Sequence, residues 1–251
     1  MTEVEEIKGD TDIFHNVTHY KQRYNWDCGV TCVLMLLDPQ QQEYMLQNFN
    51  DICHEEGFGQ CTWTIDLCYL LKRFEIPHVM YTSTIGVNEA YQTYEYYDKI
   101  IKMDRRRVQS RFAGAGGAGL DVRERRGGLA PHELAAQLRR GPLILLIDAS
   151  LLSCDLCYYN KFRLDFRWCL GGGRYRGHYV VLCGLRGTRA YYCDPARGGR
   201  GDGGGGRGEG GGVRGGRGRV CAAPLERVLR AHRAVGTDHD AILIYKDYTR
   251  T

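Results

Sequence analysis

Apolar residues along this chain repeat with two different periods, and each period predicts a different type of element. From Asp27 to Leu37 the apolar residues are spaced three and four apart, which predicts a buried helix that begins at Cys28 with Asp27 as its N-cap. Three further helices are predicted at 65–74, 131–139 and 225–234, the last two with a glycine just beyond their C-terminal end.

Strand patterns dominate the second half of the chain. A continuous apolar run covers 142–148, and further strand patterns cover 178–185, 190–194 and 241–245. Because helices come mostly first and strands mostly later, we predict an α+β fold in which a helical part packs on an antiparallel sheet. We expect a single domain over residues 1–251, with a core from about 19 to 247.

Two Gly/Arg-rich stretches, 113–128 and 197–219, interrupt these patterns. Both offer too little apolar surface to offset the entropy of ordering, so we expect flexible surface insertions. The second stretch holds six arginines against Asp202 and Glu209, a net charge of +4 that equals the net charge of the whole chain. Arg/Gly tracts can bind RNA weakly, but this one lacks interleaved aromatic residues, and the remaining residues give no nucleic-acid-binding footprint.

Composition narrows the class of protein. The chain is 43% hydrophobic and 25% charged, as in ordinary globular domains, and its longest apolar stretch, 30–37, is too short to span a bilayer. The acidic N-terminal stretch does not resemble a secretory signal. We therefore expect no membrane association, a location in the cytoplasm or the nucleus, and reduced thiols at the eleven cysteines.

The segment QRYNWDCGVTC, residues 22–32, carries the first chemical signal. A cysteine in the first turn of a helix lies near unpaired backbone N–H groups that stabilise a thiolate, and Cys28 is predicted to be there. Cys28 is therefore a candidate nucleophile. The alternative is a small buried residue on an apolar helix.

A thiolate needs a proton partner, and His178 is the best placed histidine. It follows Gly177, which leaves room for a substrate, and it opens the strand GHYVVLCGL. The next strand ends at Asp194, so two antiparallel strands can bring this carboxylate beside the imidazole and orient it. Each residue alone also fits a plain role, as a half-exposed strand residue or as a turn residue before Pro195.

Taken together, these motifs resemble a known family. QRYNWDCG, GHYVVLCGL, CDPA, SLLSCDLC and GTDHDAILIYKD are similar to segments of the guanylyl cyclase domain-containing family, also called plant-type guanylyl cyclases. That family in turn resembles the bacteriocin-processing, C39-type branch of papain-like cysteine peptidases. The resemblance implies a papain-like fold, with the cysteine in the helical part and the histidine and aspartate on the antiparallel sheet.

The resemblance also implies roles for four residues. In the C39-type branch a glutamine six residues before the cysteine donates to the oxyanion, and Gln22 stands six before Cys28. Cys28 would be the nucleophile, His178 the general base and acid, and Asp194 its orienting partner. The implied function is a thiol hydrolase that acts on an amide bond in a peptide or protein and needs no cofactor.

Two other functions stay open. The family name implies conversion of GTP to cyclic GMP, which would require Mg²⁺ or Mn²⁺ held by carboxylates near the phosphates. No phosphate-binding loop motif is present, and Asp238 and Asp240 could bind a metal or cap a strand. The second alternative is a non-catalytic interaction protein on the same scaffold.

A cysteine pair suggests a structural zinc site. Cys154 and Cys157 have the spacing of the first half of such a site, and Cys169 is a possible third ligand. The second half of the motif is missing, so the site would need a further, distant ligand. Loose packing or redox pairing of these thiols is the alternative.

Overall fold

The computed structural model describes residues 12–58, 61–88, 95–157, 175–197 and 220–245. The helices in these ranges are α1 (Cys28–Leu34), α2 (Pro39–Gln47), α3 (Phe49–Glu55), α4 (Thr64–Arg73), α5 (Glu95–Gly114), α6 (Pro131–Arg140) and α7 (Leu225–His232). The strands are β1 (Asp12–Phe14), β2 (His78–Thr82), β3 (Asp121–Glu124), β4 (Leu143–Asp148), β5 (Gly177–Arg186), β6 (Arg189–Cys193), β7 (Val220–Pro224) and β8 (Ala241–Ile244).

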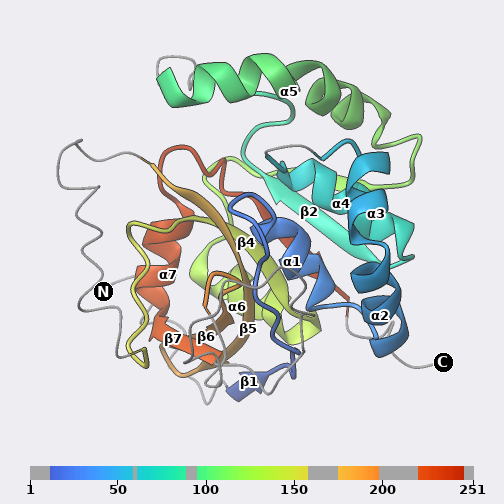
Figure 1. Cartoon of the computed structure of the whole chain (residues 1–251). Coiled ribbons are helices and arrows are strands. Elements are labelled where there is room, and N and C mark those ends of the chain that lie inside the picture. The colour runs from blue at the N-terminus through green and yellow to red at the C-terminus, as the bar shows by residue number, and fades with distance from the viewer. Residues whose placement is uncertain (1–11, 59–60, 89–94, 158–174, 198–219, 246–251) are drawn as a thin grey trace.

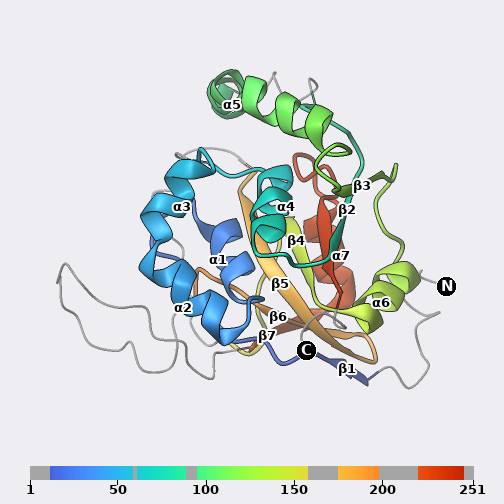
Figure 2. The ribbon, with the colours of Figure 1, turned by 90° about the vertical axis from the view of Figure 1, so that its right-hand side faces the viewer.

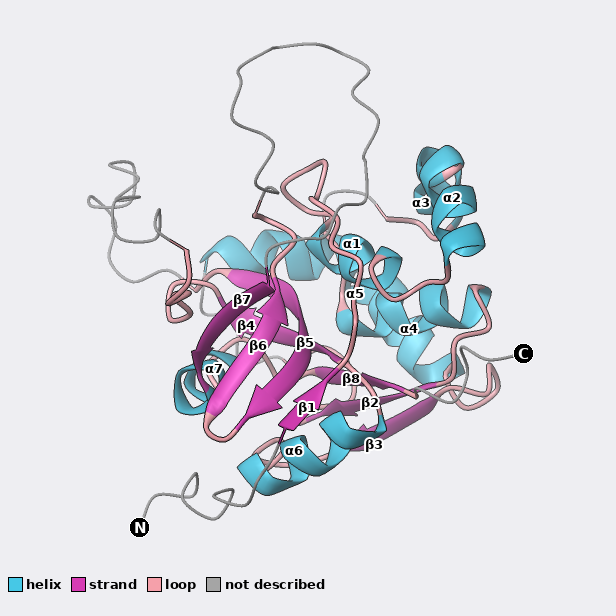
Figure 3. Cartoon of the chain, turned by 90° about the horizontal axis from the view of Figure 1, so that it is seen from below, coloured by secondary structure: helices cyan, strands magenta, loops and turns pink. Residues whose placement is uncertain are grey.

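The strands form one twisted sheet in the order β3-β2-β8-β4-β5-β6-β7, and β1 pairs with β5 (Figure 1). Every pair in this sheet is antiparallel except β2 with β3. The fold is therefore α+β with a mostly antiparallel sheet, as the sequence predicts. Seen from below, β5, β6 and β7 run side by side (Figure 3).

Helices cover both faces of this sheet (Figure 2). On one face, helices α1, α2, α3 and α4 share a hydrophobic core with Tyr179 and Val181 of β5. On the other face, α6 and α7 share a second core with Val180 and Leu182 of the same strand. The expectation of a helical part on the sheet is thus correct for one face and incomplete for the other. Because β5 is buried on both faces, its sequence reads as a nearly continuous apolar run.

Helix α1 lies directly on β5. A Cβ added at Gly29 would come within 2.9 Å of the Leu67 side chain and 3.0 Å of the Tyr179 ring. Only glycine permits this close approach without displacement of its neighbours. The approach brings Cys28, the residue before Gly29, to the N-terminal end of β5, where His178 lies.

The predicted helices and strands all occur, and their ends differ from the predicted ends by at most three residues. One prediction is wrong: 113–128 is not a flexible insertion, because it contains the end of α5, a turn and β3, which pairs with β2. Ala115, within this segment, is buried in the hydrophobic core, so the segment does contribute apolar surface. The second Gly/Arg-rich stretch lies outside the described residues, apart from Arg197.

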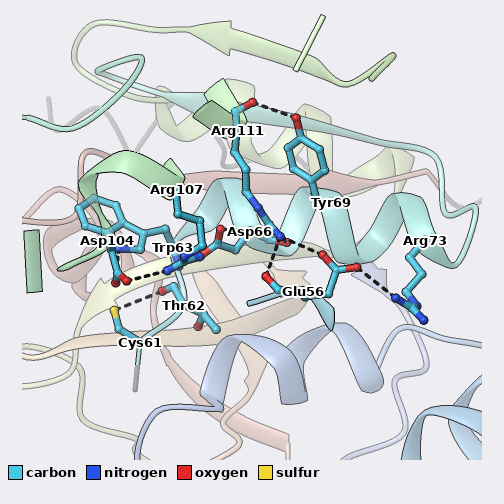
Figure 4. Close-up of polar contacts among 10 residues, drawn as sticks. All are labelled: Glu56, Cys61, Thr62, Trp63, Asp66, Tyr69, Arg73, Asp104, Arg107 and Arg111. Carbon is cyan, nitrogen blue, oxygen red and sulfur yellow. Dashed lines mark hydrogen bonds and ion pairs between the residues drawn. The ribbon is translucent and has the colours of Figure 1, made fainter. Parts of the chain in front are cut away.

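Charged side chains attach α5 to α4 (Figure 4). The carboxylate of Asp66 is fully buried and pairs with Arg107 and with Arg111, whose Nη1 lies 3.1 Å from Oδ1. Asp66 also accepts a hydrogen bond from the N–H of Trp63 at the start of α4. Arg111 continues the network to Glu56 at 3.0 Å. This network fixes the long helix against the body that carries the Cys28 site.

Candidate active site

A short loop stabilised by Asp27 leads into Cys28. The Asp27 side chain is fully buried and accepts hydrogen bonds from the N–H groups of Arg23 and Tyr24, both at 3.0 Å. Its carboxylate faces back into the loop, so the predicted N-cap bond to α1 is not made. Burial raises the pKa of Asp27 by more than these backbone bonds lower it. Asp27 thereby shapes the segment between Gln22 and Cys28.

Two neighbouring strands bring His178 and Asp194 together. The register of β5 and β6 pairs Val181 with Cys193. Continued by one residue, this register places Asp194 opposite Val180 and diagonal to His178. The hydrogen bond between His178 Nε2 and Asp194 Oδ1 is 2.8 Å long, and both side chains are largely buried.

The charges of this pair support each other. Burial lowers the pKa of His178, but its hydrogen bonds with Asp194 and with Cys28 prevail, and the pKa is raised to about 10. Burial acts to raise the pKa of Asp194, but the hydrogen bond and charge of His178 prevail and lower it to about 2. At neutral pH the pair is therefore an imidazolium and a carboxylate.

The Cys28 side chain lies close enough to His178 for its interaction to help raise the pKa of the imidazole. One helical turn further, burial raises the pKa of Cys32 well above its ordinary value, so Cys32 remains a thiol.

Gln22 is held beside the strand end that carries Asp194. Its backbone N–H donates to the carbonyl of Pro195 at 2.9 Å, and the ring of His19 lies 2.9 Å from the carbonyl of Asp194. The Gln22 side-chain amide donates to the carbonyl of Tyr24 at 2.6 Å. The Gln22 loop and the strand that precedes Asp194 thus form one framework around Cys28.

The structure corrects the interpretation of Gly177. A Cβ added there would come within 3.0 Å of the Tyr175 hydroxyl. The space beside this glycine is therefore occupied by the Tyr175 ring and is not open to a substrate.

Sequence reasoning missed several groups around the site. His19 is buried and Arg197 donates to Asp194 Oδ2 at 3.2 Å, yet neither stands in a recognisable motif. Asp27 was visible from its position before Cys28, but its partners in the preceding loop were not.

The predicted zinc half-site is brought together with a cysteine that the sequence did not indicate. Cys154 and Cys157 gather with Cys221 of β7, and the three sulfur atoms lie within 4.8 Å of one another. Cys169, the predicted third ligand, lies outside the described residues.

Comparison with known proteins places the chain in a family. A family model described as Guanylylate cyclase matches residues 17–200, a range that includes Gln22, Cys28, His178 and Asp194. The chain belongs to the guanylylate cyclase family. A relative in this family, Guanylyl cyclase 1 of Arabidopsis thaliana, is 30% identical over 234 residues, which cover 91% of this chain and 75% of the relative. No solved structure matches the chain.

The acidic residues of the segment GTDHDA, residues 236–241, have structural roles. Asp240 is buried, and its burial raises its pKa to about 8, so it is mostly protonated at neutral pH. Asp238 accepts a hydrogen bond from the Asn88 amide at 2.9 Å. Among the described residues, the side chains that come together in a group of three potential metal ligands are those of Cys154, Cys157 and Cys221, and not the acidic residues of this segment. None of the helices described for this guanylylate cyclase family member has the length and apolar run needed to cross a bilayer.

Proposed function

We propose that this protein is a thiol enzyme that uses Cys28 as a nucleophile on the carbonyl carbon of an amide bond. The observation that carries the proposal is that His178 is bonded to Asp194 through Nε2 and lies close enough to Cys28 for this thiol to influence the pKa of the imidazole. A nucleophile, a base and an orienting carboxylate in this order are the arrangement that activates a cysteine for acyl transfer.

Each residue has a defined part in the proposed reaction. The Cys28 thiolate attacks the carbonyl carbon, and His178 donates its proton to the departing amine as the carbon–nitrogen bond breaks. His178 then accepts a proton from water as this water attacks the thioester; the carbon–sulfur bond breaks, the acid is released, and the Cys28 thiolate and the His178 imidazolium are regenerated. Asp194 keeps the imidazole oriented and stabilises its charge throughout.

Gln22 is the proposed side-chain donor to the oxyanion. Its amide nitrogen carries two N–H groups and uses one for the carbonyl of Tyr24, so the second remains for a substrate oxygen. An added donor of this kind typically contributes about 3–4 kcal/mol to transition-state stabilisation. Because Asp27 holds the loop between Gln22 and Cys28, it acts as a positioning residue.

We further propose that the scaffold is papain-like, of the C39 type. In support, the cysteine begins a helix that packs on the sheet, and the histidine and the aspartate follow in that order on antiparallel strands. The proposed substrate is a peptide or protein, and the proposed chemistry requires no cofactor. A cytoplasmic location, with reduced thiols, would suit a thiol nucleophile.

The name of the relative favours a second candidate, a guanylyl cyclase that converts GTP to cyclic GMP. This reaction would depend on Mg²⁺ or Mn²⁺ and would not need the Cys28 sulfur. A substitution at Cys28 therefore separates the two candidates.

The test uses purified wild-type protein and the Cys28→Ala variant in two assays. In the first, the protein reacts with an activated ester, and mass spectrometry locates any acyl group. In the second, GTP is supplied with Mg²⁺ or Mn²⁺, and cyclic GMP is measured. The proposal predicts an acyl group on Cys28 that is lost in the variant and in His178→Gln, with hydrolysis reduced by about 10³-fold or more.

Two results would contradict the proposal. Metal-dependent cyclic GMP formation that survives in Cys28→Ala, without acylation of the wild type, would establish the cyclase instead. Inactivity in both assays, with a folded protein, would favour a non-catalytic interaction protein.

A further inference from the structure

Three cysteines form a cluster in the core that packs against α6 and α7, whereas Cys28 belongs to the core on the opposite face of the sheet. Cys157 Sγ is 3.7 Å from Cys221 Sγ, and Cys154 completes a triangle in which all three sulfurs lie within 4.8 Å of one another. All three side chains are buried, and Cys221 is fully enclosed. The proposed acyl-transfer chemistry uses none of these cysteines.

The backbone holds the three sulfurs in place from two separate parts of the chain. Cys154 and Cys157 lie in the loop after β4, whereas Cys221 is on β7. The N–H of Ala222 donates to Cys154 Sγ at 3.4 Å, and the N–H of Asp155 donates to the carbonyl of Ala222 at 2.8 Å. These reciprocal bonds attach the loop to the strand, so the ligand positions are set by the fold.

Charged side chains fix the outside of the same loop. Asp155 pairs with Arg227 at 2.6 Å and with Arg189 at 3.4 Å. Arg197 lies close enough to Cys157 and Cys221 for their charges to raise its pKa. A group of thiolates at this place would therefore have a positive neighbour.

We infer that Cys154, Cys157 and Cys221 bind a zinc ion through three thiolates. Three sulfurs that converge from a C-x-x-C turn and a neighbouring strand supply three of the four ligands of a tetrahedral zinc site, and the fourth position is left to water or to a further ligand. A disulfide would use two of the sulfurs and leave the third outside the bond. Metal binding would use all three and would release the protons of the thiols that ionise.

The zinc would stabilise the strand end that holds Asp194. Cys221 pairs with Tyr192 across β6 and β7, two residues before Asp194. Arg197, which donates to Asp194, also lies close to Cys157 and Cys221. Zinc would thus connect the loop after β4, β7 and the base of the Cys28 site, and its role would be structural.

The first experiment measures zinc in the full-length protein, purified under reducing conditions from zinc-supplemented cells. The inference predicts about one zinc per chain by elemental analysis. It also predicts that Co²⁺ added to metal-free protein produces a thiolate-to-cobalt charge-transfer band. Cys154→Ser and Cys221→Ser should lose both the zinc and the band, whereas Cys61→Ser, at a half-buried cysteine outside the cluster, should keep them.

A second measurement covers the case in which the serine variants do not fold. In the wild-type protein, bound Zn²⁺ should protect the three cluster cysteines from alkylation together, and a chelator should expose all three and lower the melting temperature. Wild-type protein without zinc or a cobalt band, or a disulfide within the cluster under reducing conditions, would overturn the inference. Cys28→Ala should retain zinc, so failure of the thiol-enzyme proposal would be distinguishable from failure of the zinc site.

Discussion

Replacement of Asp194 by Asn tests whether the carboxylate charge holds His178 in its protonated form. Asp194 Oδ1 accepts bonds from His178 at 2.8 Å and from the N–H of Ala196 at 2.9 Å, and an Asn side-chain oxygen can keep both. The variant loses only the charge and the bond from Arg197 to Oδ2. The perturbation is therefore electrostatic, with little change of shape.

The size of the effect follows from the hydrogen bond. A bond to a charged group contributes roughly 1.5–3 kcal/mol and a neutral one about 1 kcal/mol, so the imidazolium loses about 0.5–2 kcal/mol of stabilisation. At 1.36 kcal/mol per pH unit, the pKa of His178 falls from about 10 by about 0.4–1.5 pH units. The positive charge of Arg197, no longer offset by the Asp194 carboxylate, would act in the same direction.

The assay is an NMR titration of histidine-labelled protein from pH 5 to about pH 10.5, with His178→Gln to assign the His178 signals. In the wild type these signals should stay unchanged through pH 8, where ordinary histidines have already titrated. In Asp194→Asn they should titrate at lower pH than in the wild type. A wild-type His178 that titrates near 6.5, or identical titration curves for both proteins, would show that the Asp194 charge does not keep His178 protonated.

Three further predictions concern stability. Asp194 has a folded-state pKa of about 2 against 3.8, so it contributes about 2 kcal/mol above pH 4 that is lost as the pH falls through 2; urea unfolding at pH 2–5 should show this loss in the wild type and not in Asp194→Asn. Asp27→Ala leaves two loop N–H groups without their acceptor and should cost about 2–3 kcal/mol in urea unfolding, with a smaller cost for Asp27→Asn. Asp66→Ala leaves Arg107 and Arg111 without their buried partner and should lower the free energy of unfolding by about 3–5 kcal/mol. Glu55→Ala, at an exposed pair, should lower it by under about 1 kcal/mol. A similar loss of stability in both variants would contradict a stabilising role of the buried network.

The sequence predicts the elements that carry the site because their patterns are strong. The apolar spacing after Cys28 fits a helix, and the apolar run after His178 fits a buried strand. The antiparallel pairing of β5 with β6 then brings Asp194 beside His178. Short strands and polar helices such as α2 and α5 escape prediction, because tertiary contacts stabilise them more than local pattern does. Segment 113–128 shows the same limit, since β3 depends on its pairing with β2.

Contacts between distant segments account for the other misses. Nothing local to Cys221 marks it as a neighbour of Cys154, because the two are joined only when β7 adds to the edge of the sheet. Likewise, the Asp27 carboxylate has the residue type of an N-cap, and only the folded loop shows that it binds the preceding backbone instead.

The most direct test of the central claim is the reactivity of Cys28. Wild-type protein and His178→Gln are treated with limiting iodoacetamide at several pH values below 8, and mass spectrometry locates the modified cysteines. The account predicts labelling of Cys28 ahead of Cys32 and Cys61, whose pKa values are raised by burial, and slower labelling of Cys28 in the variant. Labelling of Cys28 no faster than Cys61, or unchanged by His178→Gln, would contradict an activated thiol.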